Sequence, residues 1–260
     1  MGSEDLFRKR KARSGAALHR QRLERSRNKR YLIVCEGTKT EPYYFRELLD
    51  DLQIRQQAVR IARNDGASPD RVVAHALALY EDDALSGDAY DTVYCVFDRD
   101  KHTTFEAAVQ RTKDLSAAAK PLVAITSTPC FEVWLLLHFG YTDQPFHHAG
   151  KKSVGDQVVT ALKAKSGFEK YGKGQKGIYT HLKDKLTDAL NHATQLRKHC
   201  QATGSINPAT EIDQLILTLK SVDADRKLTS WRCGGKVGLL GGSSCTHTTT
   251  GFEQLSFISS

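Results

Sequence analysis

The chain has 260 residues, is 40% hydrophobic and carries a formal net charge of +8. This length is enough for one sizeable domain with its own core. The longest apolar stretch, VWLLLHF at 133–139, is far too short to cross a bilayer, and the first residues lack the apolar middle of a signal peptide. We therefore expect a cytoplasmic protein that has no membrane segment.

The positive charge is concentrated at the start of the chain. Residues 1–30 hold 11 Lys or Arg against 3 Asp or Glu, and the remaining residues carry 27 of each sign. Because this stretch has few large apolar side chains, we expect residues 1–29 to be a disordered basic arm able to follow a phosphate backbone. A solvated tail that only improves solubility is an equally good interpretation.

Short apolar runs alternate with helical periodicities over residues 30–145. We expect strands at 30–36, 57–63, 91–98 and 121–127, and helices at 42–52, 69–85 and 104–119. Ser68 followed by Pro69 is typical of a helix start. The alternation predicts a mostly parallel four-stranded α/β sheet flanked by helices.

Carboxylates follow two of these strands. Glu36 comes directly after the first, and the third ends in FDRD, which contains Asp98 and Asp100. The carboxyl ends of parallel strands share one edge of a sheet, and side chains two positions apart point the same way. Three converging carboxylates would repel one another unless a hard cation such as Mg²⁺ or Mn²⁺ neutralises them. The alternative is that the aspartates form a turn and Glu36 is a helix-terminal charge.

Two further residues are candidates for the same edge. Glu132 is expected in the first turn of a helix opened by Thr128 and Pro129, just after the fourth strand, although a glutamate there also complements the helix dipole. Lys39 follows the first strand and could neutralise a scissile phosphate, or it could be an ordinary surface lysine.

The rest of the chain carries fewer chemical signals. Residues 146–224 are predicted to form a helical extension, and residues 225–260 a disordered tail rich in Gly, Ser and Thr. The lysines at 163–176 either contact nucleic acid or ATP or form a solvated face. Six cysteines without a C-x-x-C pair argue against a zinc site.

Four sequence blocks carry a resemblance to a known family. They are VCEGTKTEPYYF at 34–45, VFDRD at 96–100, STPCFEVWLLLHF at 127–139 and INPATEIDQLI at 206–216. Together they resemble the RloB-like family, and a strand ending in Glu-Gly followed by one ending in Asp-x-Asp resembles the Toprim domain. The resemblance covers residues 28–222. It implies a Toprim-like fold and a metal-dependent nuclease of bacterial anti-phage and restriction-modification loci, often encoded beside an AAA-type ATPase partner.

By position, the resemblance implies that Glu36 is the Toprim glutamate and that Asp98 and Asp100 are the metal-binding pair. The expected activity is Mg²⁺- or Mn²⁺-dependent endonucleolytic cleavage of DNA or RNA, with Glu132 and Lys39 as further catalytic candidates. Two alternatives stay open: a non-catalytic sensor or effector subunit that binds nucleic acid or an ATPase, and a phosphatase, because FDRDKHT also resembles the opening motif of haloacid dehalogenases. Homodimerisation is left open as well.

Overall fold

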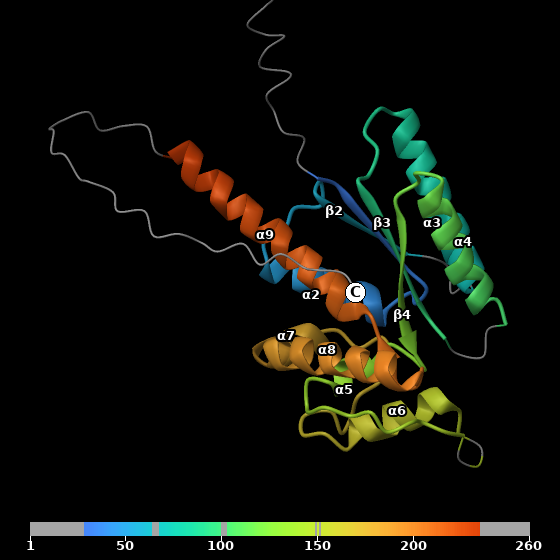
Figure 1. Cartoon of the computed structure of the whole chain (residues 1–260). Helices are drawn as coiled ribbons and strands as arrows, with labels where there is room; N and C mark the ends of the chain where they lie inside the picture. The colour runs from blue at the N-terminus through green and yellow to red at the C-terminus, as the bar shows by residue number, and fades with distance from the viewer. Residues whose placement is uncertain (1–28, 64–67, 100–102, 149, 151, 235–260) are drawn as a thin grey trace, which may run out of the picture. The chain divides into compact units, whose positions relative to one another are not determined.

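The computed structural model describes residues 29–63, 68–99, 103–148, 150 and 152–234, with Arg63 and the last ten of these as backbone only (Figure 1). The chain divides into two units, residues 1–224 and 225–260. The sheet, its covering helices and the predicted site residues belong to the first unit.

A five-stranded mixed sheet forms the centre of this unit. The strands are β1 (Tyr31–Cys35), β2 (Val59–Arg63), β3 (Thr92–Asp98), β4 (Leu122–Thr128) and β5 (Ala209–Thr210). Their order is β2-β1-β3-β4-β5; the first four strands are parallel, and β5 runs antiparallel to β4. The four predicted strands are thus confirmed to within two residues, but the predicted count of four was wrong. With two residues, β5 is too short to show any periodicity.

The three helices predicted between the strands are also present: α2 (Thr40–Asp51), α3 (Pro69–Leu85) and α4 (Phe105–Ala117). Ser68 is the N-cap of α3 and Pro69 its first residue, as the sequence predicts. The later helices are α5 (Glu132–Leu136), α6 (Val154–Lys163), α7 (Ile178–Leu182), the short 3₁₀ helix η1 (Lys183–Lys185), α8 (Leu186–Thr203) and α9 (Ile212–Gly234). Glu132 therefore lies in the first turn of a helix, although this helix starts later than Thr128 and Pro129, because β4 extends to Thr128.

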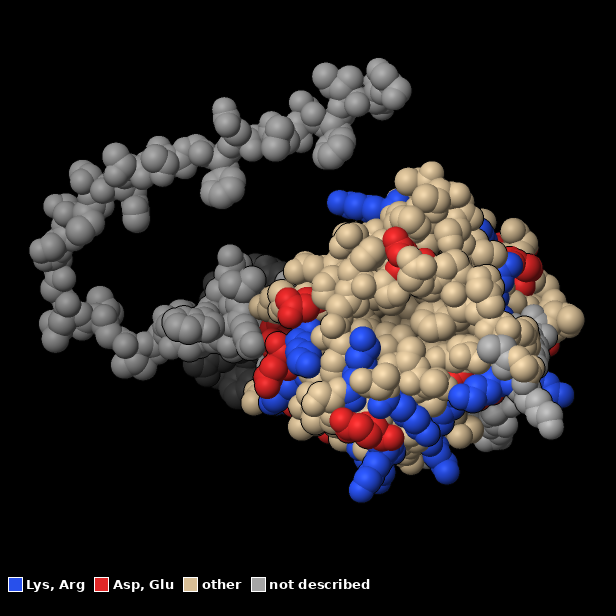
Figure 2. Space-filling view, turned by 90° about the horizontal axis from the view of Figure 1, so that it is seen from below, with Lys and Arg blue, Asp and Glu red and all other residues tan. Residues whose placement is uncertain are grey.

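The two faces of the sheet are covered by different helices. Alternate residues of a strand point to opposite faces, and in β1 Leu32 and Val34 join a cluster with α3 and α4, whereas Ile33 and Cys35 join the larger cluster on the other face. That larger cluster contains residues of α2 and of α5 to α9, so the segment after residue 146 shares its core with the sheet. Figure 2 views the molecule from below, the side on which Figure 1 places α6.

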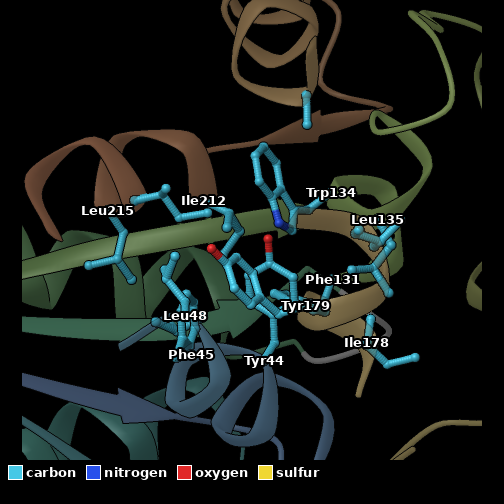
Figure 3. Close-up of a cluster of buried hydrophobic side chains, with 14 of the residues drawn as sticks. Tyr44, Phe45, Leu48, Phe131, Trp134, Leu135, Ile178, Tyr179, Ile212 and Leu215 are labelled. Carbon is cyan, nitrogen blue, oxygen red and sulfur yellow. The ribbon is translucent and has the colours of Figure 1, made fainter. Parts of the chain in front are cut away.

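The larger cluster is centred on aromatic side chains. Tyr44 packs edge-to-face against Phe45, Phe131 and Tyr179, with ring centroids 5.5–5.8 Å apart. Trp134 is fully buried beside them, and Figure 3 shows these side chains pointing toward one another from α2, α5 and α7. This packing fixes α5 against α2, and both helices begin at the carboxyl edge of the sheet. No helix in the described part of the chain is long and apolar enough to span a bilayer.

Candidate functional site

Glu36 and Asp98 meet at the carboxyl edge of the sheet, as predicted. The Glu36 backbone N–H donates to the Val96 carbonyl, which keeps the residue after β1 alongside β3. The Glu36 carboxylate accepts a 2.9 Å hydrogen bond from the backbone N–H of Asp98. The Asp98 carboxylate in turn accepts one of 3.1 Å from the N–H of Phe131, at the start of α5. These backbone contacts tie β1, β3 and α5 together at one point.

Glu132 joins this edge and is held by the loop between α6 and α7. Its side chain is only 2% exposed, although it carries a carboxylate. The Tyr171 hydroxyl donates a 3.0 Å hydrogen bond to Glu132 Oε1, and Lys173 Nζ lies 3.4 Å from Oε2. A buried carboxylate requires a compensating charge or hydrogen bonds. Lys173 and Tyr171 therefore belong to the site, a role that the sequence alone did not assign to them.

Glu41 is a fourth carboxylate, which the sequence analysis did not single out. It is the second residue of α2, and its side chain folds back over Gly37. A Cβ atom on Gly37 would lie 2.0 Å from Glu41 Oε2, so any larger residue at 37 would displace this carboxylate. The presence of glycine after Glu36 is thus explained by packing, because a side chain at position 37 would occupy the space of the Glu41 carboxylate. A possible signal was present in the sequence, because Glu41 stands within the block VCEGTKTEPYYF, but a first-turn glutamate is usually explained by the helix dipole alone.

The site holds more negative charge than its surroundings neutralise. Burial raises the pKa of Glu41 to about 7, and the negative charges of Glu132 and Glu36 add to the increase. Burial likewise raises the pKa of Asp98 well above its usual range, with further contributions from Glu41 and Glu132. Burial opposes the charge of Lys173, but the carboxylates outweigh it, so the pKa of Lys173 is raised. In this arrangement, protons, Lys173 or another cation must balance the carboxylates.

This electrostatic arrangement predicts a pH-dependent difference in stability. Glu41 is protonated in both folded and unfolded states below about pH 4.5, whereas near pH 6 only the folded state keeps the proton. The folded state then binds more protons than the unfolded state, so the Glu41 contribution to stability is lost as pH rises from about 4.5 to 7. We expect Glu41→Gln to gain about 1–3 kcal/mol over the parent across this window when metal is removed by EDTA.

The quantity to measure is the difference in unfolding free energy between Glu41→Gln and the parent, because His138 changes the stability of both proteins with pH in the direction opposite to Glu41. Burial lowers the pKa of His138 to about 4, so its contribution to stability grows as pH rises from about 4 to 6.5. This contribution is common to both proteins and cancels in the comparison. Urea unfolding of both proteins at pH 4.5, 6 and 7.5 measures the difference. A difference independent of pH would show that Glu41 ionises normally.

Two predicted site residues remain. Lys39 lies close to the loop that carries Lys173, and Asp100 is outside the described residues. Lys39 precedes α2, and its aliphatic stem packs under the loop that carries Lys173: a Cβ atom on Gly174, where φ is +82°, would lie 2.9 Å from Lys39 Cδ. The Gly174 N–H also donates a 2.8 Å hydrogen bond to Thr40 Oγ1. The loop is thus anchored to the start of α2, and Lys173, which this loop carries, pairs with Glu132.

The donor set fits a hard divalent cation by its chemistry. Within the described residues, no group of three or more His, Cys, Asp or Glu side chains is already gathered as a metal site. However, Glu36, Glu41, Asp98 and Glu132 offer only oxygen donors, and the buried Glu132 Oε2 has the ion pair with Lys173 but no hydrogen bond. Oxygen ligands and excess negative charge are what Mg²⁺ and Mn²⁺ require.

Fold and site together define an α/β protein with four carboxylates, one buried and three half-buried, at the carboxyl edge of its sheet, beside a lysine-bearing loop. A family model described as RloB-like protein matches residues 31–219. The chain therefore belongs to the RloB-like family, as its sequence blocks indicated. No curated protein and no solved structure matches the chain.

Proposed function

We propose that this protein is a divalent-metal-dependent nuclease with a Toprim-type site. The observation that carries the proposal is that four carboxylates, one directly after β1 and the others on α2, β3 and α5, lie near enough at one edge of the sheet to influence one another, with raised pKa values for Glu41 and Asp98. Strongly perturbed carboxyl groups at the carboxyl edge of a parallel sheet are typical of catalytic sites.

In this proposal Glu36, Glu41, Asp98 and Glu132 hold the cation, together with Asp100 if it joins them. A bound Mg²⁺ or Mn²⁺ supplies charge neutralisation at the phosphate and activation of water. A carboxylate of the cluster accepts the proton of the attacking water as general base. Lys173 and Lys39 contact the phosphate oxygens from the border of the cluster.

A basic surface next to the cluster supports a polyanionic substrate. The segment from α6 to η1 carries exposed lysines at 163, 170, 173, 176, 183 and 185. Figure 2 shows Lys and Arg side chains gathered over part of the face on this side of the molecule, with fewer acidic ones between them. Since Lys173 connects this surface to Glu132, a phosphate backbone lying across it would reach the carboxylates.

The test is cleavage of supercoiled plasmid and of structured RNA by the full chain with Mg²⁺, Mn²⁺ or EDTA. Asp98→Asn removes a carboxylate with little change of shape, and Asp82→Asn, at an exposed position on α3, is the matched control. We expect metal-dependent cleavage by the parent and the control and none by Asp98→Asn. Equal cleavage by all three proteins would contradict the proposal.

A second candidate is a subunit that acts only within an assembly, in keeping with the anti-phage role and AAA-type ATPase partner that the family resemblance implies. The observation in its favour is the ion pair between Lys173 and Glu132, which places a cation of the protein itself at the cluster. If the isolated chain is inactive but cleaves nucleic acid once the ATPase encoded beside it is added, the assembly is the enzyme.

The basic arm should affect substrate binding rather than chemistry. Arg30 must be kept in the truncation, because it pairs with Asp83 and Asp88 and stacks on Tyr90. We expect deletion of residues 1–28 to flatten the slope of log affinity against log salt by roughly 0.9 per lost phosphate contact on duplex DNA. KM should rise more than kcat falls. An unchanged salt slope would instead assign binding to the lysines of 163–176, which Lys170→Ala and Lys176→Ala then test.

A further inference from the structure

The outer edge of β4 is largely unpaired in the described part of the chain. Val93 N–H donates to the Pro121 carbonyl and Arg99 N–H to the Ser127 carbonyl, so these odd-numbered residues face β3. Backbone groups alternate in direction along a strand, so residues 122, 124, 126 and 128 face away from β3. On that side β5 pairs with β4 only at residues 127 and 128. The Glu211 carboxylate accepts a hydrogen bond from the N–H of Thr126, and the backbone N–H of Glu211 donates one to the Thr126 carbonyl. The N–H and carbonyl of Ala124 and the carbonyl of Leu122 are left facing outward.

This free edge lies in a groove of about 630 Å³. One wall is α4, beside β4 in Figure 1, and the other is the end of α8 with residues 205–211. Only four large apolar side chains are exposed in the described residues, and two of them line this groove, Val123 (39% exposed) and Ile206 (55%). An unpaired strand edge beside exposed apolar side chains is the arrangement to which extended peptides add as a further strand.

One wall of the groove carries a lysine that has no ion pair in the part of the chain that the structure describes. Arg99 pairs with Glu106 and Arg197 with Asp213, whereas the Glu211 carboxylate keeps its charge and accepts hydrogen bonds from the N–H and the hydroxyl of Thr126. Lys113, which is exposed on α4, forms no ion pair within the described residues. An acidic side chain on the bound segment would complement it.

We propose that this groove binds an extended segment of another polypeptide, with alternating apolar side chains and an acidic residue facing Lys113, as an added strand beside β4. The bound segment would lie on the same side of β4 as β5, beside the part of β4 that β5 does not reach because the chain turns into α9 at Ile212. Pairing with a second copy of β4 is disfavoured, because it would bring the α4 and the 205–211 segment of one copy against those of the other. The inference does not depend on the nuclease proposal, since the groove contains none of the four carboxylates.

The test uses the full chain and fluorescein-labelled decapeptides that alternate Val or Ile with Thr and carry Glu, Lys or Ser at one scanned position. Fluorescence polarisation measures binding, and hydrogen exchange measures protection of the Ala124 amide. We expect Glu peptides to bind best, Lys113→Glu to reverse the preference between Glu and Lys peptides, and Ile206→Asp to weaken binding at least about tenfold. The control is Leu85→Asp, because Leu85 is 89% exposed outside the groove, and it should bind as the parent does.

Backbone pairing has a further signature. N-methylation of those peptide amides that face β4 should abolish binding, whereas methylation of the intervening amides should leave it unchanged. The proposal is overturned if no peptide binds at about 1 mM, where the binding free energy would be only about −4 kcal/mol, or if binding leaves the Ala124 amide unprotected. It is equally overturned if sedimentation shows a dimer that Ile206→Asp converts to a monomer, since a second copy would then occupy the groove.

Discussion

Glu41→Gln is expected to abolish metal-dependent cleavage and at the same time to stabilise the metal-free protein at neutral pH. The substitution preserves size and removes the charge that burial and its neighbours Glu132 and Glu36 oppose. Loss of an outer-shell partner of a metal site costs roughly 10–100-fold in activity or metal affinity, and loss of a ligand should cost more. A gain in stability together with a loss of activity is characteristic of a residue retained for function rather than for folding.

Two further variants make this prediction specific. Gly37→Ala should displace the same carboxylate, since the new Cβ atom would occupy its place, and should reduce cleavage while Glu41 itself is still present. Glu81→Gln removes a glutamate from the surface of α3, where it pairs with Lys120, and should change neither property by much. The measurements are the initial cleavage rate with Mg²⁺ and the midpoint of urea unfolding in EDTA. Full activity of Glu41→Gln would exclude Glu41 from the catalytic group.

Trp134→Ala should produce the largest loss of stability, about 3–5 kcal/mol in the free energy of unfolding. Trp134 has no exposed surface, and its indole lies 4.8 Å from the ring of His138 in an edge-to-face contact. Its removal opens a cavity within the cluster that holds α5 against α2, so the lost contacts cannot be replaced by water at low cost. Because Glu132 is the first residue of α5, the same variant should also weaken the site.

Chemical denaturation followed by circular dichroism measures this loss. Trp134→Phe keeps part of the aromatic volume and should lose less stability than the alanine variant. Leu217→Ala is the exposed control, since Leu217 is 49% exposed on α9, and its effect should stay within about 0.5 kcal/mol. An equal effect of Trp134→Ala and Leu217→Ala would show that α5 is not held by this cluster.

The sequence alone determined the α/β alternation and the positions of two candidate site residues. The buried strands have continuous apolar runs bounded by turn residues, which is a local signal, and Glu36 and Asp98 stand directly at strand ends. The rule that parallel strands share one carboxyl edge then brings these two residues together without further information. Glu132 was located in the same way, because it follows β4 after a short turn.

Only the tertiary structure decided which other residues join them. Glu41 reaches the cluster because α2 begins only a few residues after β1 and Gly37 leaves room for the carboxylate to fold back. Lys173 and Tyr171 lie in an irregular loop about 40 positions beyond Glu132, and nothing in its local pattern shows where it packs. The strand β5 exists through its pairing with β4, whose Ser127 lies 83 positions from Thr210. Such long-range contacts depend on how the whole core packs, which periodicity and local propensity do not encode.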